Sequence, residues 1–357
     1  METFSIHFII SEYAKELFAC LQAKGKNSFD CGMERLADAA NEVYHLLSFV
    51  LEKDKVFLLS HKEYELTASE RETFLTCFER RKNGEPLAYI VGRKEFYGYD
   101  FLVDNSTLIP RPDTEILVDE AIKFYYFQKD NENTSEKTCA ISNFQIVDLG
   151  TGTGCILLSV LKECGNACGV GIDINPKAVE LARKNAENLG LQEKCAFFTA
   201  DFTDTNFSEK LELEILHTAK IDCLTSNPPY IPDYEYEILD KGVKGYEPKT
   251  ALVSGNSLAG IQGLYHAEKI LALGEKILRK GGLILLEHGY DQGRALRELC
   301  SSYAFFEIKT LYDFGNLVAG SGYAVGYDAM QRLYAAHPEV TAVFTFCHPE
   351  VTAVFTF

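Results

Sequence analysis

The sequence predicts an α/β protein with an N-terminal helical bundle domain, a β-hairpin linker and an open, mainly parallel sheet. Over residues 1–94, apolar residues recur three and four apart with charges between them, which is typical of amphipathic helices. Residues 95–112 are rich in aromatic and β-branched side chains around a Gly-Tyr-Asp turn at 98–100, which indicates a hairpin. From residue 113 onward, short apolar runs alternate with amphipathic segments, as in a doubly wound sheet.

The helical region carries clear boundary signals. SEYAKELFACLQAKG and ADAANEVYHLLSFVLEKD have the helical period, and Thr67 and Glu70 form a T-x-x-E capping box before ETFLTCFERRKNG. Gly84 is expected to end that last helix, because glycine adopts the left-handed conformation of a helix C-terminus. We interpret residues 1–94 as a small helical domain.

The elements after the hairpin follow in order. A helix over 113–127 precedes the polar stretch 128–143, which is expected to be a surface loop. Asn175 and Pro176 should begin one helix of this region, which Gly190 should end. The strands are expected at FQIVDL, GVGIDI, AFFTAD, IDCLTS, GLILLEH and FEIKTLY, and further helices at CILLSVLKEC, SLAGIQGLYHAEKILALGEKILRK and DQGRALRELCSS.

The C-terminal residues contain an internal duplication. HPEVTAVFTF occupies 337–346 and recurs at 348–357. The copies are interpreted either as two appended β-strands or as an extension produced by local duplication or a shifted reading frame, and we favour the extension. We therefore place the α/β domain at 113–328 and an atypical tail at 329–357, a β-prone aggregation hazard rather than a site.

Composition narrows the class of protein. Among 357 residues, 35 are Lys or Arg and 52 are Asp or Glu, so the formal net charge is −17. A surplus of acid disfavours a nucleic-acid substrate, because neutralising phosphates needs Lys and Arg. The 11 cysteines form no C-x-x-C pair, which indicates reduced thiols and no metal site. With neither a signal peptide nor a membrane-spanning stretch in the sequence, we expect a cytoplasmic protein.

A glycine-rich turn follows the first strand of the predicted sheet. It comprises Gly150, Thr151, Gly152, Thr153 and Gly154, between FQIVDL and a helix. Such turns lie at the carboxyl ends of strands, where ligands bind, and glycines allow the backbone to approach a ligand closely. The dinucleotide fingerprint G-x-G-x-x-G is not met, which favours a ligand without a pyrophosphate. The alternative is a turn that exists only for tight packing.

The next two strand ends strengthen the interpretation as a ligand site. Asp173 ends GVGIDI, where a carboxylate can accept hydrogen bonds from both hydroxyls of a ribose. Asp201 ends AFFTAD and Phe202 follows it, so that a carboxylate and an aromatic ring could hold an adenine. Together the three strand ends predict a nucleoside cofactor.

The fourth strand leads into Asn227-Pro228-Pro229-Tyr230. The two prolines fix φ and stiffen the turn, which can hold the Asn227 side chain and a backbone carbonyl toward one point. Two such oxygens accept both hydrogens of a planar NH2 group, and Tyr230 can stack on it. This arrangement orients the nitrogen for attack on an electrophile. An ordinary strand-to-loop turn is the alternative.

These motifs resemble a known family. DLGTGTG, GIDIN, SNPPYIP and GYEPKTALVSG are similar to S-adenosylmethionine-dependent methyltransferases with an N-P-P-Y motif. GEPLAYIVG at 84–92 and TLIPRPDTE at 107–115 resemble the release factor glutamine N5-methyltransferases, over about residues 12–328. The resemblance implies a Rossmann-like fold with a mainly parallel seven-stranded sheet, of which TLYDFGNLVAGSGYAVGYD matches the last strand pair only loosely.

The resemblance also implies the activity: methyl transfer from S-adenosyl-L-methionine to the glutamine amide of the Gly-Gly-Gln motif in class I release factors. We further expect a monomer, in which the helical domain over 1–94 orients the release factor. Residues 150–154 would line the methionine end of the cofactor, Asp173 the ribose, and Phe202 the adenine, where the family usually has tryptophan. Asn227, Pro228, Pro229 and Tyr230 would bind the glutamine, with Asn227, Pro228 and Tyr230 catalytic and Asn227 also beside the cofactor.

Other interpretations stay open at this point. One alternative is an adenine-N6 methyltransferase, because the exocyclic amine of adenine presents the same NH2 geometry to the N-P-P-Y loop. Another is a protein of this fold that binds a partner without catalysis. Glu287-His288 is more consistent with a structural role than with a catalytic pair, and Arg111 fits a substrate contact and a structural role equally well. The acidic run that follows the N-P-P-Y turn, over 233–240, is interpreted as a solvated loop face.

Overall fold

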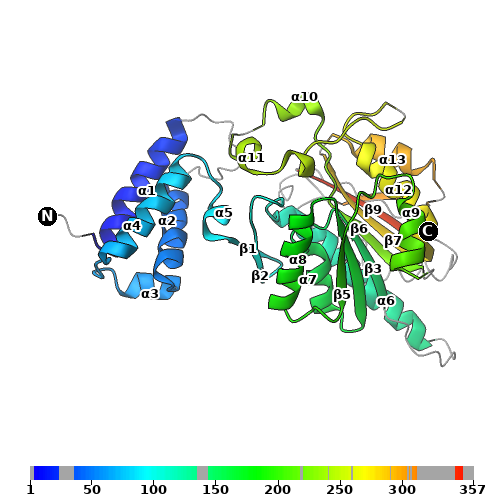
Figure 1. Cartoon of the computed structure of the whole chain (residues 1–357), viewed down its shortest axis with the longest axis horizontal. Coiled ribbons are helices and arrows are strands. Elements are labelled where there is room, and N and C mark those ends of the chain that lie inside the picture. The colour runs from blue at the N-terminus through cyan, green and yellow to red at the C-terminus, as the bar shows by residue number, and fades with distance from the viewer. Residues whose placement is uncertain are drawn as a thin grey trace, which may run out of the picture. The chain divides into compact units, whose positions relative to one another are not determined.

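The chain forms two compact units, which are described separately (Figure 1). The computed structural model describes residues 4–23, 36–134, 144–217, 220–239, 241–258, 260–289, 291–303, 305, 308–311 and 342–348. The helical unit comprises Met1–Arg93, Val103–Asn105 and Glu237–Pro248, and the sheet unit comprises Lys94–Leu102, Ser106–Tyr236 and Lys249–Phe357.

The helical unit is built from amphipathic helices around an apolar core of aliphatic and phenylalanine side chains. Its helices are α1 (Ile6–Ala23), α2 (Leu36–Leu51), α3 (Lys55–Ser60), α4 (Ala68–Lys82), α5 (Leu87–Val91) and α11 (Lys241–Tyr246). Phe74 and Phe78 of α4 are fully buried and stack at 5.9 Å between ring centroids. The capping box is confirmed, since Thr67 accepts the Glu70 N–H and Glu70 accepts the Thr67 N–H. Gly84 follows the helix with φ +101°, as expected.

A charged pair is buried inside this unit. Arg81 of α4 donates from Nε to Oε2 of Glu42 at 2.6 Å and from Nη2 to Oε1 at 3.1 Å. Its side chain is 3% exposed, against 19% for Glu42. A third bond, from Nη1 to the Glu85 carbonyl, anchors the segment after α4. The pair therefore ties α2, α4 and the start of α5 together.

The predicted hairpin is present, with its turn shifted by one residue. Strands β1 (Arg93–Phe96) and β2 (Tyr99–Leu102) form a two-stranded sheet. The turn residues are Tyr97 and Gly98, both with positive φ, as a two-residue hairpin loop requires. Asn185 then holds Leu102 by donating to its carbonyl at 3.1 Å and accepting its N–H at 2.8 Å.

The sheet unit contains the parallel sheet that the sequence predicts. Its strand order is β5-β4-β3-β6-β7-β9-β8, and every adjacent pair is parallel. The strands are β3 (Phe144–Leu149), β4 (Ala167–Asp173), β5 (Cys195–Thr199), β6 (Ile221–Ser226), β7 (Leu278–Gly289), β8 (Ile308–Leu311) and β9 (Ala342–His348). The order changes direction between β3 and β6, and this switch point is where α/β sheets bind ligands.

Helices cover both faces of this sheet (Figure 1). Leu283 and Leu285 of β7 face one cluster, while Ile284 and Leu286 face the other, as the alternation of a strand requires. The first cluster is shared with α6 (Glu115–Thr134), α7 (Cys155–Glu163) and α8 (Pro176–Asn188), and the second with α9 (Phe207–Lys210), α12 (Tyr265–Ile277) and α13 (Gly293–Cys300). Short elements complete the unit: η1 (Pro112–Thr114), η2 (Leu211–Ile215), α10 (Asp233–Tyr236) and η3 (Lys249–Ala251).

Two predicted segments have other boundaries in the structure, while one predicted helix start is confirmed. The loop predicted over 128–143 begins as helix, because α6 continues to Thr134; residues 135–143 lie outside the described part. The helix predicted over 257–280 is shorter, since Gly260 and Gly263 adopt positive φ before α12 and β7 already begins at Leu278. The Asn175 N-cap is confirmed, with its side chain accepting the Lys177 N–H.

The tail differs most from its prediction. We expected it to lie outside the domain, yet Ala342–His348 forms β9 between β7 and β8. An uncharged run rich in β-branched and aromatic residues suits a central parallel strand, which explains why it enters the sheet. Residues 349–357 of the second copy and residues 312–341 lie outside the described residues. Of the last strand pair, expected over 310–328, only residues 310–311 are described, at the end of β8.

Candidate active site

Two loops meet at the switch point of the sheet. The glycine loop follows β3, the N-P-P-Y loop follows β6, and these strands pair with Leu149 opposite Ser226. Ser226 donates its hydroxyl to the Leu149 carbonyl at 2.6 Å. A Cβ on Gly150 would lie 3.9 Å from the Asn227 carbonyl oxygen. The structure thus brings the predicted cofactor loop against the predicted acceptor loop.

The glycine loop owes its shape to alternating left-handed residues. Gly150, Gly152 and Gly154 have φ of +70°, +53° and +79°. Thr151 between them donates its N–H to the Ile172 carbonyl of β4 at 2.9 Å, while Thr153 offers its carbonyl to Asn185 Nδ2 at 2.9 Å. The loop is therefore fixed to its neighbours through Thr151 and Thr153, and three of its five residues carry no side chain that could obstruct a ligand.

Asp148, which the sequence analysis did not single out, holds this loop through a hydrogen bond to Thr151. It is fully buried and accepts hydroxyl hydrogens from Thr151 at 2.6 Å and Thr225 at 2.8 Å. Burial raises the pKa of this carboxyl to about 6, against the lowering effect of the two hydroxyls. Asp148 thus joins β3, the glycine loop and β6. The sequence signal that could have identified it is an acidic residue near the end of a largely apolar strand.

Asp173 stands at the end of β4 and contacts the glycine loop directly. Its Oδ2 accepts the Gly152 N–H at 2.9 Å, and its Oδ1 accepts the Asn175 N–H at 2.8 Å. Burial raises the pKa of Asp173, although these backbone hydrogen bonds act in the opposite direction. A carboxylate has about four lone-pair positions, so each oxygen retains capacity for a ribose hydroxyl.

Asp201 and Phe202 lie at the end of β5, next to β4. Oδ1 of Asp201 accepts the Thr203 N–H at 2.8 Å and the Thr203 hydroxyl at 2.6 Å, which shapes the turn. Phe202 is half-buried and meets the His266 ring edge-on at 5.9 Å. Burial lowers the pKa of His266, whose Nδ1 is 2.8 Å from the Ser254 hydroxyl. The predicted adenine position is therefore bordered by the Phe202 ring, with the His266 ring packed against it edge-on.

The N-P-P-Y loop is held at both ends. Asn227 is half-buried and Pro228 is buried, whereas Pro229 and Tyr230 are half-buried. Ile231 exchanges backbone hydrogen bonds with Leu252 and Ser254 at 2.9 Å each, and these two residues belong to the predicted GYEPKTALVSG motif. Prolines and flanking bonds together keep the loop rigid.

Gln292, which sequence reasoning missed, fastens the same loop to the end of β7. It is 6% exposed and donates from Nε2 to the Tyr230 carbonyl at 2.9 Å. Its Oε1 accepts the Gly289 N–H at 2.8 Å. Gly263 lies so close that a Cβ there would overlap both Gln292 Nε2 and the Tyr230 oxygen. No local sequence pattern marks such a contact.

Thr114 and Glu287 also reach the N-P-P-Y loop, although neither was predicted as a site residue. Asn227 donates from Nδ2 to Thr114 Oγ1 at 3.2 Å, and the Thr114 hydroxyl donates to Glu287 Oε2 at 2.7 Å. Glu287, which we expected to be structural, is thus one side chain away from Asn227. His288 is 1% exposed, and its Nδ1 lies 2.8 Å from the Gly289 carbonyl.

Two further candidates are neighbours of these loops in the sequence. Asp233, in the acidic run, is exposed and pairs with Lys249 at 3.4 Å. Arg111 immediately precedes η1, three residues before Thr114. The described residues include no group of three or more His, Cys, Asp or Glu placed to hold a metal ion. None of their helices is long and apolar enough to span a bilayer.

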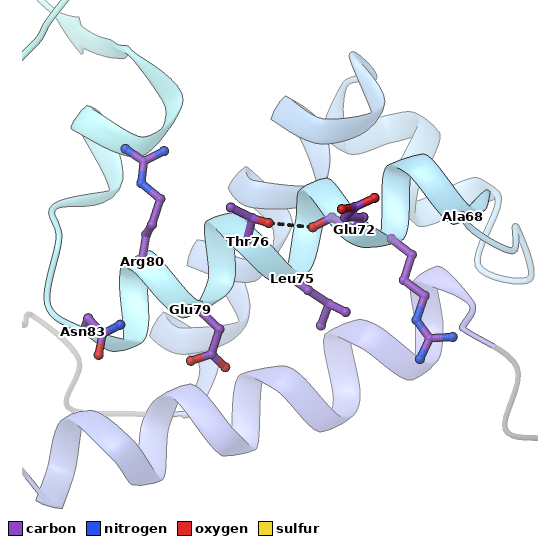
Figure 2. A pocket seen from close by; sticks show the side chains of 8 residues that line it. Ala68, Glu72, Leu75, Thr76, Glu79, Arg80 and Asn83 are labelled. Atoms are coloured by element: carbon purple, nitrogen blue, oxygen red, sulfur yellow. Dashed lines mark hydrogen bonds between the residues drawn. The ribbon is translucent and has the colours of Figure 1, made fainter.

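A separate groove runs along α4 in the helical unit (Figure 2). Figure 2 shows Leu75 and Glu79 pointing the same way from the helix, whereas Arg80 points to the opposite side. Thr76 donates its hydroxyl to the Glu72 carbonyl at 2.9 Å. The groove is lined by Ala68, Arg71, Glu72, Leu75, Thr76, Glu79, Arg80 and Asn83. It combines the apolar side chains of Ala68 and Leu75 with charges of both signs.

Comparison with known proteins matches both units. A family model described as "Methyltransferase domain" matches residues 141–321, and one described as "PrmC N-terminal domain" matches residues 32–92. Among solved structures, the S-adenosylmethionine-dependent methyltransferase from Agrobacterium tumefaciens has a TM-score of 0.39 and 13% identity, covering 74% of this chain and 68% of that one.

Curated relatives are more similar in sequence. The release factor glutamine methyltransferase of Nitratidesulfovibrio vulgaris is 37% identical over 231 residues, which are 65% of this chain and 69% of that protein. The protein of the same name from Clostridium acetobutylicum is 34% identical over 272 residues, 76% of this chain and 86% of that protein. That of Yersinia pestis is 36% identical over 271 residues, with shares of 76% and 87%.

Proposed function

Since the chain belongs to the release factor glutamine methyltransferases, we propose that it methylates N5 of the glutamine in the Gly-Gly-Gln motif of class I release factors. The methyl donor of this enzyme class is S-adenosyl-L-methionine. One observation carries the assignment of the site: the N-P-P-Y loop and the glycine loop adjoin at the switch point, where Gly150 faces the Asn227 carbonyl.

The residues at this edge fit the cofactor. The glycine loop exposes backbone toward a ligand, and we assign Gly150, Thr151, Gly152, Thr153 and Gly154 to the methionine end. Asp173 offers lone pairs to the ribose, while Asp201 and Phe202 border the adenine. When bound there, the cofactor supplies an electrophilic methyl group on a sulfonium.

The N-P-P-Y loop acts on the acceptor. An amide nitrogen is a weak nucleophile, because its lone pair is delocalised into the carbonyl group. Asn227 Oδ1 and the backbone carbonyl of Pro228 are assigned to accept its two N–H groups, which orients the nitrogen toward the methyl group. Pro229 stiffens the loop and Tyr230 stacks on the planar amide. Catalysis by this loop consists of alignment and exclusion of water rather than a strong base.

Methyl transfer from labelled S-adenosylmethionine to a purified class I release factor tests the activity. A matched reaction uses the same factor with the motif glutamine replaced by alanine. We expect label on the first protein and none on the second. Label on both would place the methyl group elsewhere in the factor. Label on neither, with the cofactor still bound, would reject the proposed substrate.

Partners and compartment follow from this function. We propose that the enzyme works as a monomer in the cytoplasm, where release factors act, without a nucleic-acid substrate. The net charge of −17 supports the exclusion of nucleic acid. Sedimentation of the enzyme alone should give one species of about the chain mass, 40.0 kDa. A stable dimer would contradict the monomer.

We further propose that the helical unit orients the release factor through the groove along α4. The groove is lined by charged side chains and by Leu75, which also packs partly against the core of the helical unit. Leu75→Ala should raise the KM for the release factor by about fivefold, the scale of one lost apolar contact, with kcat and cofactor affinity unchanged. Thr73→Ala, on the same helix but outside the groove, is the control. An unchanged KM in Leu75→Ala would reject the groove.

A further inference from the structure

A buried hydrogen-bonded chain ends on the side chain that is assigned to the substrate amide. It runs from Asn227 Nδ2 to Thr114 Oγ1 over 3.2 Å, and from Thr114 Oγ1 to Glu287 Oε2 over 2.7 Å. Thr114 is 3% exposed and Glu287 is 5% exposed. The three residues come from η1, the end of β6 and the end of β7, all in the sheet unit. The contact is therefore made by the fold and not by neighbouring sequence.

The chemistry of the middle group gives this chain a direction. A threonine hydroxyl has one hydrogen to donate, and an ionised carboxylate can only accept. Thr114 therefore donates to Glu287 and is left to accept from Asn227. Only the NH2 end of an asparagine amide can donate, so that end must face Thr114. Oδ1, at the other end of the amide group, then points away from Thr114 and can act as an acceptor.

We propose that Thr114 and Glu287 are positioning residues for glutamine methylation, which fix the Asn227 amide in the orientation that presents Oδ1 to the substrate NH2. This inference rests on the proposed function of Asn227. With the amide rotated by half a turn, its NH2 would meet the substrate NH2, and two donors repel. The arrangement also explains an acid buried at the end of β7, a position that is costly unless the carboxylate is hydrogen-bonded.

Two substitutions at Thr114 separate this role from packing. Thr114→Val keeps the side-chain shape and removes the hydroxyl, whereas Thr114→Ser keeps the hydroxyl. In the methyl-transfer assay, kcat should fall at least about tenfold for Thr114→Val, the scale of a lost positioning contact. Thr114→Ser should retain most of the activity. The cofactor Kd, measured by calorimetry, should stay within about twofold of the wild type in both, since Asn227 and not the cofactor loop is disturbed.

A matched control removes another buried hydroxyl from the same unit. Ser159 of α7 is fully buried, and its Oγ has no hydrogen-bond partner within the described residues. Ser159→Ala should leave kcat unchanged. A similar loss in Ser159→Ala would show that kcat responds to any buried hydroxyl, and would overturn the proposal. Melting temperatures of all variants report whether each one folds.

A double-mutant cycle then shows whether Thr114 acts through Asn227. Adding Thr114→Val to Asn227→Ala should change kcat by less than about twofold, because the amide to be oriented is already gone. Glu287→Gln, which can donate to Thr114 and reverse the chain, should lower kcat at least about fivefold and provides a test if Thr114→Val does not fold. Additive losses in the cycle, or wild-type kcat in both Thr114→Val and Glu287→Gln, would overturn the inference. An inactive wild type would instead reject the proposed function.

Discussion

Asp173 Oδ2 accepts the backbone N–H of Gly152 at 2.9 Å, so the carboxylate that ends β4 holds the middle of the loop that follows β3. Two consecutive strands thus share one hydrogen bond at the edge where the cofactor is assigned. We assign a second function to the same carboxylate, whose remaining lone pairs could accept the ribose hydroxyls. On this assignment, loop shape and cofactor affinity are coupled through a single side chain.

Asp173→Ala should therefore weaken cofactor binding more than the loss of one ribose contact implies. We expect the cofactor Kd to rise by about a hundredfold, as loss of two charge-assisted hydrogen bonds allows. Calorimetric titration with S-adenosylhomocysteine measures this Kd. Asp204→Ala, an exposed carboxylate that shapes a turn beyond β5, should leave the Kd unchanged. Equal effects in the two variants would contradict the coupling.

Asp148 should make stability depend on pH in an unusual direction. Burial raises its pKa from 3.8 to about 6, so between these values the folded protein retains a proton that the unfolded chain has lost. Its contribution to the unfolding free energy therefore falls as pH rises from about 4 to about 6, and is constant above that range. Asp148→Asn does not titrate. As the pH rises through this range, the unfolding free energy of Asp148→Asn should therefore increase by on the order of 2–3 kcal/mol relative to that of the wild type.

Urea unfolding of both proteins at pH 4, 5, 6 and 7.5 measures this difference. The absolute stability of Asp148→Asn is expected to be lower throughout, since an NH2 group replaces one of the two oxygens that accept the threonine hydroxyls, and that hydroxyl must turn to accept instead of donate. The informative quantity is the slope of the difference with pH. A difference that is independent of pH would show that Asp148 does not carry the shifted proton.

Gly263→Ala should impair catalysis by displacing the N-P-P-Y loop. A Cβ at Gly263 would overlap the Tyr230 carbonyl and Gln292 Nε2, so their hydrogen bond must open. We expect kcat/KM to fall at least about tenfold, because a shift of about 1 Å in a positioning loop is costly. Gly260→Ala is the control, since Gly260 has a similar φ of +78° but open space around it.

Both glycine variants should lose about 1 kcal/mol of stability from the left-handed backbone. Unfolding midpoints and kcat/KM are therefore measured together. Comparable losses of kcat/KM in Gly260→Ala and Gly263→Ala would mean that general destabilisation, and not the contact with Tyr230, limits the reaction.

Arg81→Met should destabilise the helical unit strongly. Removing the guanidinium leaves the Glu42 carboxylate largely buried without its main partner, which costs about 3 kcal/mol. Arg81→Met combined with Glu42→Gln should recover part of the loss, because no unpaired charge remains. Urea unfolding of the full chain measures both. Lys15→Met, which removes the partner of exposed Glu12, should leave the midpoint unchanged. A loss in the double variant as large as in Arg81→Met would refute the explanation by an unpaired charge.

Features set by neighbouring residues could be predicted from the sequence. The capping box at Thr67 and the Asn175 N-cap depend on hydrogen bonds between residues three and two positions apart. The residue types at these positions are those that helix caps prefer, so the sequence indicates both caps directly. The alternation of buried strands and amphipathic helices likewise predicted the sheet, since each period is a local property. The glycine loop followed from its own composition, and its three left-handed glycines confirm why those residues are there.

Features made by distant segments could not be predicted in this way. Thr114 and Glu287 lie 173 positions apart, and only the docking of η1 against β7 makes them partners. Gln292 reaches Tyr230 over 62 positions for the same reason. The tail was misplaced because its β-prone composition says that it can form a strand, but not which strands it pairs with. The assigned roles of Asn227, Asp173 and the other site residues stay predictions until the variants are measured.

The position of β9 has a consequence for how the chain matures during synthesis. The ribosome makes β7 and β8 first, yet β9 is the strand that pairs with both. Until Ala342–His348 has left the exit tunnel, the nascent sheet has an open edge at β7, and β8 lacks the strand it pairs with in the finished protein. Strand edges of this kind recruit other chains. The interval between completing β7 and releasing β9 is therefore the period in which this protein most needs protection from its neighbours, and slower elongation there would lengthen that exposure.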